Sequence, residues 1–131
     1  HGWMTSLIPI YIKKAYCDNP LFSDTKVIYS IYDDDFEELM QKDFASKIKL
    51  EGINSKDLKH YKTPDYVSVI KAAIDFSDGV IIGSPKINPE LISYLNETEK
   101  PCLEYQPMDR YVDAYNDFYE EVLVNDPVTV D

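Results

Sequence analysis

The sequence predicts an α/β domain in which about three parallel strands are flanked by helices, as in half of a Rossmann-like domain. Residues 26–31 and 79–83 are rich in β-branched and aromatic side chains without polar alternation, which is typical of strands covered on both faces. Helical patterns separate these strands from each other and from a shorter strand at 102–105. Strands that are joined through helices pair in parallel by right-handed crossovers.

The first part of the chain begins with a predicted helix over residues 4–16. Apolar residues recur there at helical spacing, and Thr5 or Ser6 can cap the start of the helix. An acidic loop follows the first strand. Beyond that loop the chain is polar and only loosely periodic, so we expect short helical pieces around 36–49 and 55–60.

The second half of the chain carries clearer helix signals. Thr63 is the expected cap and Pro64 the first residue of a helix over 65–77, which Gly79 would end in a left-handed conformation. Asparagine and proline open the next helix, at about 89–96.

The last predicted helix, at about 108–123, has a wide aromatic face opposite an acidic one. This face is interpreted as core, with a platform for stacking sugars as the alternative. Its residues are Tyr111, Tyr115, Phe118, Tyr119, Val122 and Leu123.

The charge argues against nucleic acid and anionic membrane surfaces as partners. The chain has 131 residues, 24 of them acidic and 13 basic, and a net charge of −11. Both kinds of partner are polyanions that select Lys and Arg. Residues 87–131 alone hold eleven acidic residues against Lys100 and Arg110, which we interpret as a solvated acidic face.

The cysteines and histidines bear on the redox compartment of the protein and on whether it has a zinc site. Cys17 and Cys102 lie far apart without metal-type spacing, and His1 and His60 are the only histidines. Two half-buried free thiols are expected, and they favour a reducing, cytoplasmic compartment. The spacing of the cysteines and the small number of histidines argue against a zinc site. No apolar run approaches the roughly 20 residues of a membrane-spanning helix.

Two motifs follow predicted strands, at the sheet edge where open α/β sheets bind ligands. The triplet Asp33–Asp35 is either a solvated loop or a set of oxygen ligands for Mg²⁺ beside a phosphate. The second reading makes a magnesium-dependent α/β phosphotransferase one alternative function. The turn Gly83-Ser84-Pro85 offers a hydroxyl and amides, and the chain lacks the glycine-rich phosphate-binding fingerprints.

Four ordered segments resemble the amino-terminal lobe of ADP-glucose-type glycogen and starch synthases, glycosyltransferase family 5. HGWMTSLIP (1–9) is similar to the family's H-D-W-H-[ST]-[AG]-L-x-P, and KVIYSIYD (26–33) to K-[ST]-V-F-T-[IV]-H-N. VSVIKAAIDFSD (67–78) resembles I-[NS]-F-L-K-[AG]-G-[IL]-x-Y-A-D, and VIIGSP (80–85) follows it as the family's I-[TN]-x-V-S-P does. The helix at 111–123 resembles the final helix that packs back on this lobe.

The resemblance implies a fold and a reaction. The fold is a Rossmann-like half domain of glycosyltransferase-B type, with residues 1–124 as the carboxyl half of the amino-terminal lobe and 125–131 as a frayed tail. The reaction is transfer of glucose from ADP-glucose to a 1,4-α-glucan, with no metal and no cofactor. The implied substrate-binding residues are His1, Gly2, Tyr32, Asp33, Gly83 and Ser84.

Departures from the family pattern suggest that this chain alone is inactive and holds no catalytic residue. Gly2 and Met4 stand where the family has Asp and the second His, while Tyr32 and Asp33 replace its His-Asn pair. The second, nucleotide-binding lobe is also expected to be absent. The alternative is therefore a non-catalytic module that binds a glucan or a protein partner, either a missing amino-terminal half or a second copy at an exposed sheet edge.

Overall fold

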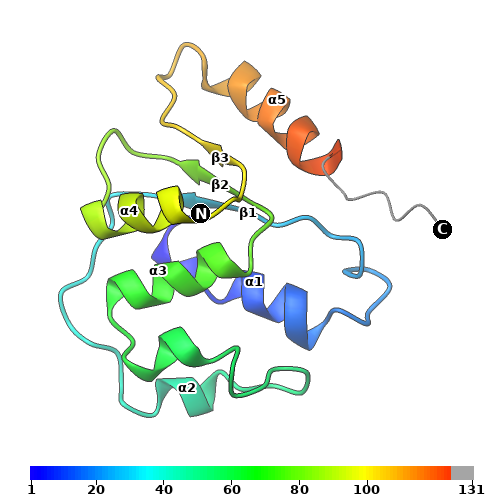
Figure 1. Cartoon of the computed structure of the whole chain (residues 1–131), viewed down its shortest axis with the longest axis vertical. Helices are drawn as coiled ribbons and strands as arrows, with labels where there is room; N and C mark the ends of the chain where they lie inside the picture. Colours follow the sequence, from blue (N-terminus) through cyan, green and yellow to red (C-terminus); the bar gives the residue numbers. More distant parts are fainter. Residues whose placement is uncertain (125–131) are drawn as a thin grey trace.

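A computed structural model describes residues 1–124, and the predicted tail at 125–131 lies outside the described residues. Figure 1 shows the arrangement of the elements along the chain. In order they are η1 (Trp3–Thr5), α1 (Ile8–Ile10), η2 (Tyr11–Ala15), β1 (Ile28–Ile31), α2 (Phe44–Lys47), η3 (Lys59–Lys62), α3 (Tyr66–Asp75), β2 (Gly79–Ile82), α4 (Pro89–Glu97), β3 (Cys102–Leu103) and α5 (Tyr111–Val124).

The three strands form one parallel sheet in the order β1-β2-β3, which confirms the predicted fold class. Ile28 lies opposite Gly79, and Ile31 lies opposite Ile82. The carboxyl ends of β1 and β2 therefore finish level with each other. Among the described residues no strand lies beside the outer edge of β1, so the predicted pairing at a sheet edge stays a prediction.

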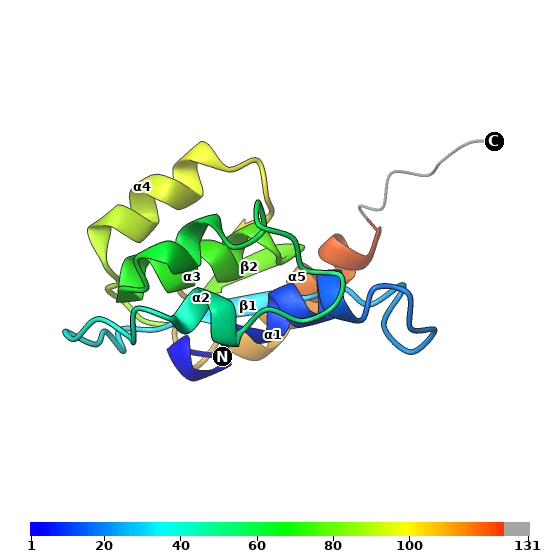
Figure 2. The same cartoon turned by 90° about the horizontal axis from the view of Figure 1, so that it is seen from below.

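Helices α3 and α4 cover one face of the sheet and form the main core with it (Figure 2). Side chains of a strand alternate between the two faces, so Val80 and Ile82 point toward these helices. They pack with Ile70 and Ile74 of α3. A second cluster continues the core on the far side of α3, where Val69, Ala72, Ile10 and Tyr61 join α3 to the segments α1 and η3.

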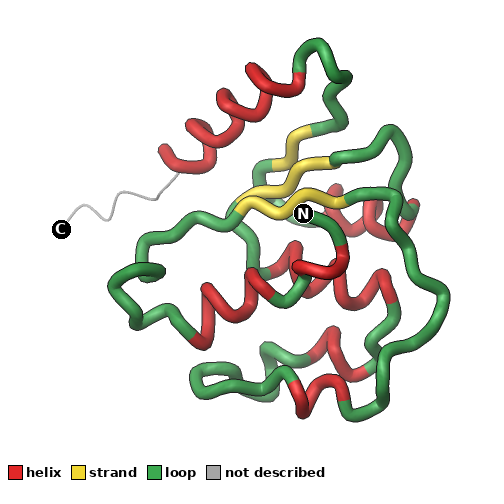
Figure 3. Tube along the Cα trace, turned by 180° about the vertical axis from the view of Figure 1, so that it is seen from behind, coloured by secondary structure: helices red, strands yellow, loops and turns green. Residues whose placement is uncertain are grey.

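Helix α5 packs on the opposite face of the sheet and lies apart from the other helices (Figure 3). Its contact is small, because Phe118 and Val122 are its buried residues and they pack on Ile81. The prediction that the whole aromatic face is core is therefore wrong. A single helix on a three-stranded sheet can bury only the stripe that meets the strands, and the rest of this face stays in solvent.

The prediction that Gly79 ends the helix in a left-handed conformation is wrong. Gly79 begins β2, and its φ is not positive. A Cβ atom at this position would lie 2.8 Å from Val122 Cγ2 and 3.1 Å from Phe118 Cζ. The glycine is needed because α5 approaches the strand closely, not because the backbone turns.

The helix starts also differ in part from the predictions. The predicted 4–16 helix is broken into η1, α1 and η2, and Thr5 Oγ1 donates to the carbonyls of His1 and Gly2 instead of capping α1. The cap of α3 is Asp65, which accepts from the Ser68 amide at 2.7 Å, and not Thr63. The helix thus begins after Pro64, whereas α4 begins as predicted, with Asn88 as its cap.

Several predicted elements are shorter in the structure than expected. The expected helical pieces at 36–49 and 55–60 reduce to α2 and η3, and the third strand reduces to two residues.

Cys17 and Cys102 are free but both are exposed, so the predicted half-burial is wrong. Cys17 follows the last turn of η2, and Cys102 lies on the edge strand β3. No helix within residues 1–124 is long and apolar enough to cross a membrane.

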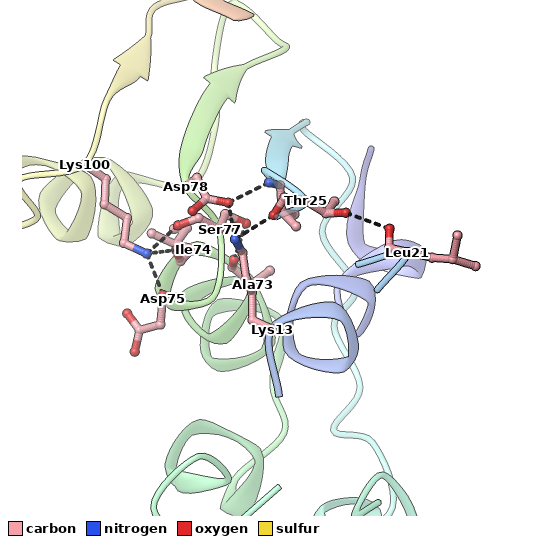
Figure 4. A network of polar contacts seen from close by, with 10 residues as sticks. Lys13, Leu21, Thr25, Ala73, Ile74, Asp75, Ser77, Asp78 and Lys100 are labelled. Atoms are coloured by element: carbon pink, nitrogen blue, oxygen red, sulfur yellow. Dashed lines mark hydrogen bonds and ion pairs between the residues drawn. The ribbon is translucent and has the colours of Figure 1, made fainter. Parts of the chain in front are cut away.

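A polar network joins the end of α3 to the start of the sheet (Figure 4). The Lys100 ammonium donates to the carbonyl oxygens of Ile74 at 2.9 Å and Ser77 at 2.6 Å, and also to that of Asp75. Ile74 and Asp75 lie in the last turn of α3, where carbonyls lack the regular helical donor four residues on, and the Ile74 carbonyl also accepts from the Ser77 amide. Nearby, the Asp78 carboxylate accepts from the Val27 amide at 2.6 Å and pairs with Lys13.

Candidate functional site

The candidate site lies where β1 and β2 end at their carboxyl termini and the first residues of the chain lie beside them. In open α/β sheets this edge is the usual place for ligands. The structure brings the six predicted substrate-binding residues to this edge, and we call them the edge cluster: His1, Gly2, Tyr32, Asp33, Gly83 and Ser84.

Gly2 is held against β1 in a conformation that favours glycine. Its amide donates to the Ser30 carbonyl at 3.0 Å, and its carbonyl accepts from the Tyr29 hydroxyl at 2.7 Å. Its φ is +73°, which side chains with a Cβ rarely adopt. A Cβ here would also lie 2.6 Å from Oδ2 of Asp34. The Asp34 carboxylate therefore occupies the space that a side chain at position 2 would need.

Asp34 lies just after the end of β1, and the sequence analysis named it only as part of the acidic triplet and not among the substrate-binding residues. Its Oδ2 accepts from the Trp3 amide at 3.0 Å, and its Oδ1 accepts from the Tyr66 hydroxyl at 3.0 Å. The same hydroxyl lies 3.0 Å from the Tyr32 carbonyl oxygen. Burial raises the pKa of Tyr66 strongly, and the negative charge of Asp34 raises it further. Tyr66 thus stays a neutral donor that fixes both the carboxylate and the end of β1.

The ring of Tyr32 lies over the backbone of Gly83. A Cβ at Gly83 would lie 2.6 Å from Tyr32 Cε1, so glycine makes room for the ring. The imidazole of His1 approaches the same ring edge to face, with centroids 6.2 Å apart. The Asp33 amide donates to Ser84 Oγ at 3.0 Å, which ties the two loops together. An aromatic ring, an imidazole and several polar groups therefore share one edge.

The acidic triplet does not converge on one point. Asp34 is directed toward Trp3 and Tyr66, whereas the Asp35 carboxylate accepts from the Asn88 side-chain amide at 3.2 Å. Within residues 1–124, no three or more His, Cys, Asp or Glu side chains are grouped so that they could hold a metal ion. The three carboxylates of the triplet therefore do not form one preformed ligand group, and the magnesium-dependent alternative stays a prediction.

Comparison with known proteins identifies the family. The sequence model of the starch synthase catalytic domain matches residues 1–100. The chain belongs to this family. The match confirms the resemblance seen in the four motif segments, and it ends before α5.

Curated relatives carry the same kind of name. The chain is 29% identical over 95 residues to a glycogen synthase of Photobacterium profundum, covering 72% of this chain and 18% of the relative. It is 28% identical over 104 residues to the glycogen synthase of Thermotoga maritima, covering 76% of this chain and 19% of the relative. The aligned part is therefore about a fifth of the length of these relatives. No solved structure gives a significant match.

Proposed function

We propose that this chain is part of a lobe of a glycogen- or starch-synthase-type glucosyltransferase and that its edge cluster binds a glucose unit of a 1,4-α-glucan. The observation that carries the proposal is the convergence of residues far apart in sequence on one sheet edge. The Tyr32 ring lies over Gly83, and the His1 imidazole approaches this ring. Beside the ring, Ser84 Oγ accepts a hydrogen bond from the Asp33 amide. An aromatic ring with hydrogen-bonding groups around it suits a ligand that is apolar on one face and polar at its rim.

The charge of this edge favours the neutral glucan over the nucleotide sugar. Asp33, Asp34 and Asp35 follow β1 directly, and the whole chain carries a net charge of −11. Like charges repel each other, so these carboxylates disfavour the diphosphate of ADP-glucose as a ligand at this edge. We therefore assign the glucan, and not the donor, to this edge.

Glucose transfer by residues 1–131 alone is not expected. Gly2 and Tyr32 stand where the family pattern has an acid and a histidine, and Asp34 fills the space next to Gly2 with both oxygens already bonded. Losing one group that stabilises a transition state commonly costs about 10²–10³ in rate. We propose the glucosyltransferase activity only for a longer protein that contains this lobe.

The test is an amide ¹H–¹⁵N NMR titration of residues 1–131 with maltoheptaose. We expect localised shifts at Gly2, Tyr32, Asp33 and Gly83. Cellohexaose, which has the same sugar in β-linkage, and ADP-glucose should each give much weaker shifts there. A dispersed spectrum that does not change at these residues on addition of maltoheptaose contradicts the proposal.

A matched pair of variants distinguishes specific binding at the edge cluster from unspecific binding to any exposed tyrosine. Tyr32→Ala should weaken maltoheptaose binding about tenfold, because it removes the ring on which the sugar would lie. Tyr16→Ala is the control, since Tyr16 is 47% exposed and follows η2 away from the edge cluster. Equal affinities of the two variants would contradict the assignment of Tyr32. Incubation with labelled ADP-glucose should leave no labelled glucan.

A further inference from the structure

Helix α5 carries a row of three tyrosines, of which the middle one packs partly against the sheet and the outer two are exposed. Tyr111, Tyr115 and Tyr119 follow each other at four-residue spacing, and we call them the tyrosine row. Their ring centroids are 5.6 Å apart for the first pair and 6.2 Å for the second, with edge-to-face contacts. Tyr111 is 42% exposed and Tyr119 is 37% exposed. The row is therefore a preformed aromatic surface whose first and last rings are open to solvent.

The direction of α5 places the start of this row beside the carboxyl edge of the sheet. Phe118 and Val122, near the end of the helix, lie over Gly79, which is the first residue of β2. The helix thus runs antiparallel to the strands, and its first turns lie toward the strand ends (Figure 1). In agreement, burial raises the pKa of Tyr115 and repulsion from Tyr32 raises it further. The start of the tyrosine row therefore lies toward the same end of the sheet as the edge cluster, which follows the carboxyl ends of β1 and β2.

The charge of α5 disfavours anionic ligands. Residues 111–124 contain no Lys or Arg and four acidic residues, Asp113, Asp117, Glu120 and Glu121. Anionic ligands are therefore repelled. Tyrosine rings offer an apolar face to sugar C–H groups, and their hydroxyls and the nearby carboxylates can hydrogen-bond sugar hydroxyls. A neutral polyhydroxylated chain fits these groups best.

We propose that the tyrosine row is a binding surface for the part of a linear 1,4-α-glucan that extends beyond the glucose unit at the edge cluster. The inference rests on the proposed function, because the edge cluster fixes where the chain begins. It adds a second, longer contact on α5, which lies outside the matched residues 1–100. Long glucans should gain affinity from this surface, whereas short ones should not reach it.

The experiment compares maltoheptaose with maltotriose by NMR titration of the full chain. The double variant Tyr111→Ala/Tyr119→Ala should bind maltoheptaose about tenfold more weakly than the unaltered chain and maltotriose equally well. The matched control is Val112→Ala, since Val112 is 53% exposed on the same helix and is not in the row. Phenylalanine at both positions should restore most of the affinity, because the rings remain.

The outcomes separate this inference from the proposed function. If the edge cluster shifts with both sugars and the double variant binds maltoheptaose normally, the tyrosine row is not a glucan surface. If neither sugar shifts the edge cluster, the proposed function itself fails. If the signals of the row shift on protein dilution and not on sugar addition, the row is an interface between two copies and the inference is overturned. A dispersed spectrum of the double variant shows that the comparison uses folded protein.

Discussion

The two faces of the sheet bury very different amounts of apolar side chain. On the face of α3 and α4, eleven buried residues of the described chain form one cluster that includes Ile70, Ile74 and Leu91. On the face of α5, three buried residues do so, Ile81, Phe118 and Val122. Apolar burial contributes roughly 25 cal/mol per Å², so the first face supplies most of the stability. The second face leaves Tyr111 and Tyr119 exposed, where they can meet a ligand.

The largest expected effect comes from the α3 face. Ile74 is fully buried between α3 and the sheet, and Ile74→Ala leaves a cavity there. We expect the free energy of unfolding to fall by about 2–5 kcal/mol. Urea unfolding followed by circular dichroism measures this loss.

The control for this variant lies on α5. Leu123 is 61% exposed, and Leu123→Ala should change the free energy of unfolding by less than about 0.5 kcal/mol. Comparable losses for the two variants would mean that α5 holds the fold as strongly as α3 does, which would remove the contrast between the faces.

The same contrast explains which features the sequence could predict. The strands, α3 and α4 depend on local signals, namely buried β-branched runs, an apolar stripe and the Asn88-Pro89 start, and these predictions held apart from their exact ends. The role of Gly79 and the exposure of the aromatic face depend on how closely α5 approaches the sheet. No local pattern encodes that distance, so both predictions failed.

The site shows the same limit. The sequence pointed to the strand ends, because the motifs follow predicted strands and resemble those of a known family. The resemblance selected Asp33 alone, and nothing in three identical side chains in a row marked Asp34 as the one held inside the fold. Only the fold distinguishes them, by placing Asp34 against Gly2 and under the Tyr66 hydroxyl.

A medium effect is expected where α5 touches the sheet. Gly79→Ala adds a Cβ 2.8 Å from Val122 Cγ2, and either the helix or the strand has to move. The expected loss is about 1–3 kcal/mol in the free energy of unfolding, again from urea unfolding. Val122→Ala removes the nearest clashing atom, although Phe118 Cζ stays 3.1 Å away, so the double variant should lose less than the sum of the two single variants. Strict additivity would show that the clash is not the cause.

The smallest expected effect lies at the edge where the two faces meet, and it depends on pH. Tyr66 is buried and its hydroxyl contacts the Tyr32 carbonyl and Asp34 Oδ1, so Tyr66→Phe should cost about 1 kcal/mol at pH 7. Burial raises the pKa of Tyr66 above the 10.0 of a free tyrosine, and the Asp34 charge adds to this.

The sign of the pH effect follows from that shift. A raised folded-state pKa gives stability that is complete below pH 10 and is lost as pH rises, because the unfolded chain ionises first. Each such tyrosine contributes a slope of about 1.4 kcal/mol per pH unit above pH 10. Tyr29, Tyr61 and Tyr94 have raised pKa values as well, so Tyr66→Phe should make the alkaline loss of stability shallower without abolishing it. Unfolding midpoints between pH 9 and 11 measure this slope. An unchanged slope in Tyr66→Phe would mean that Tyr66 ionises in the folded protein as it does in the unfolded chain, and the edge would then be open to water and not closed by the α3 face.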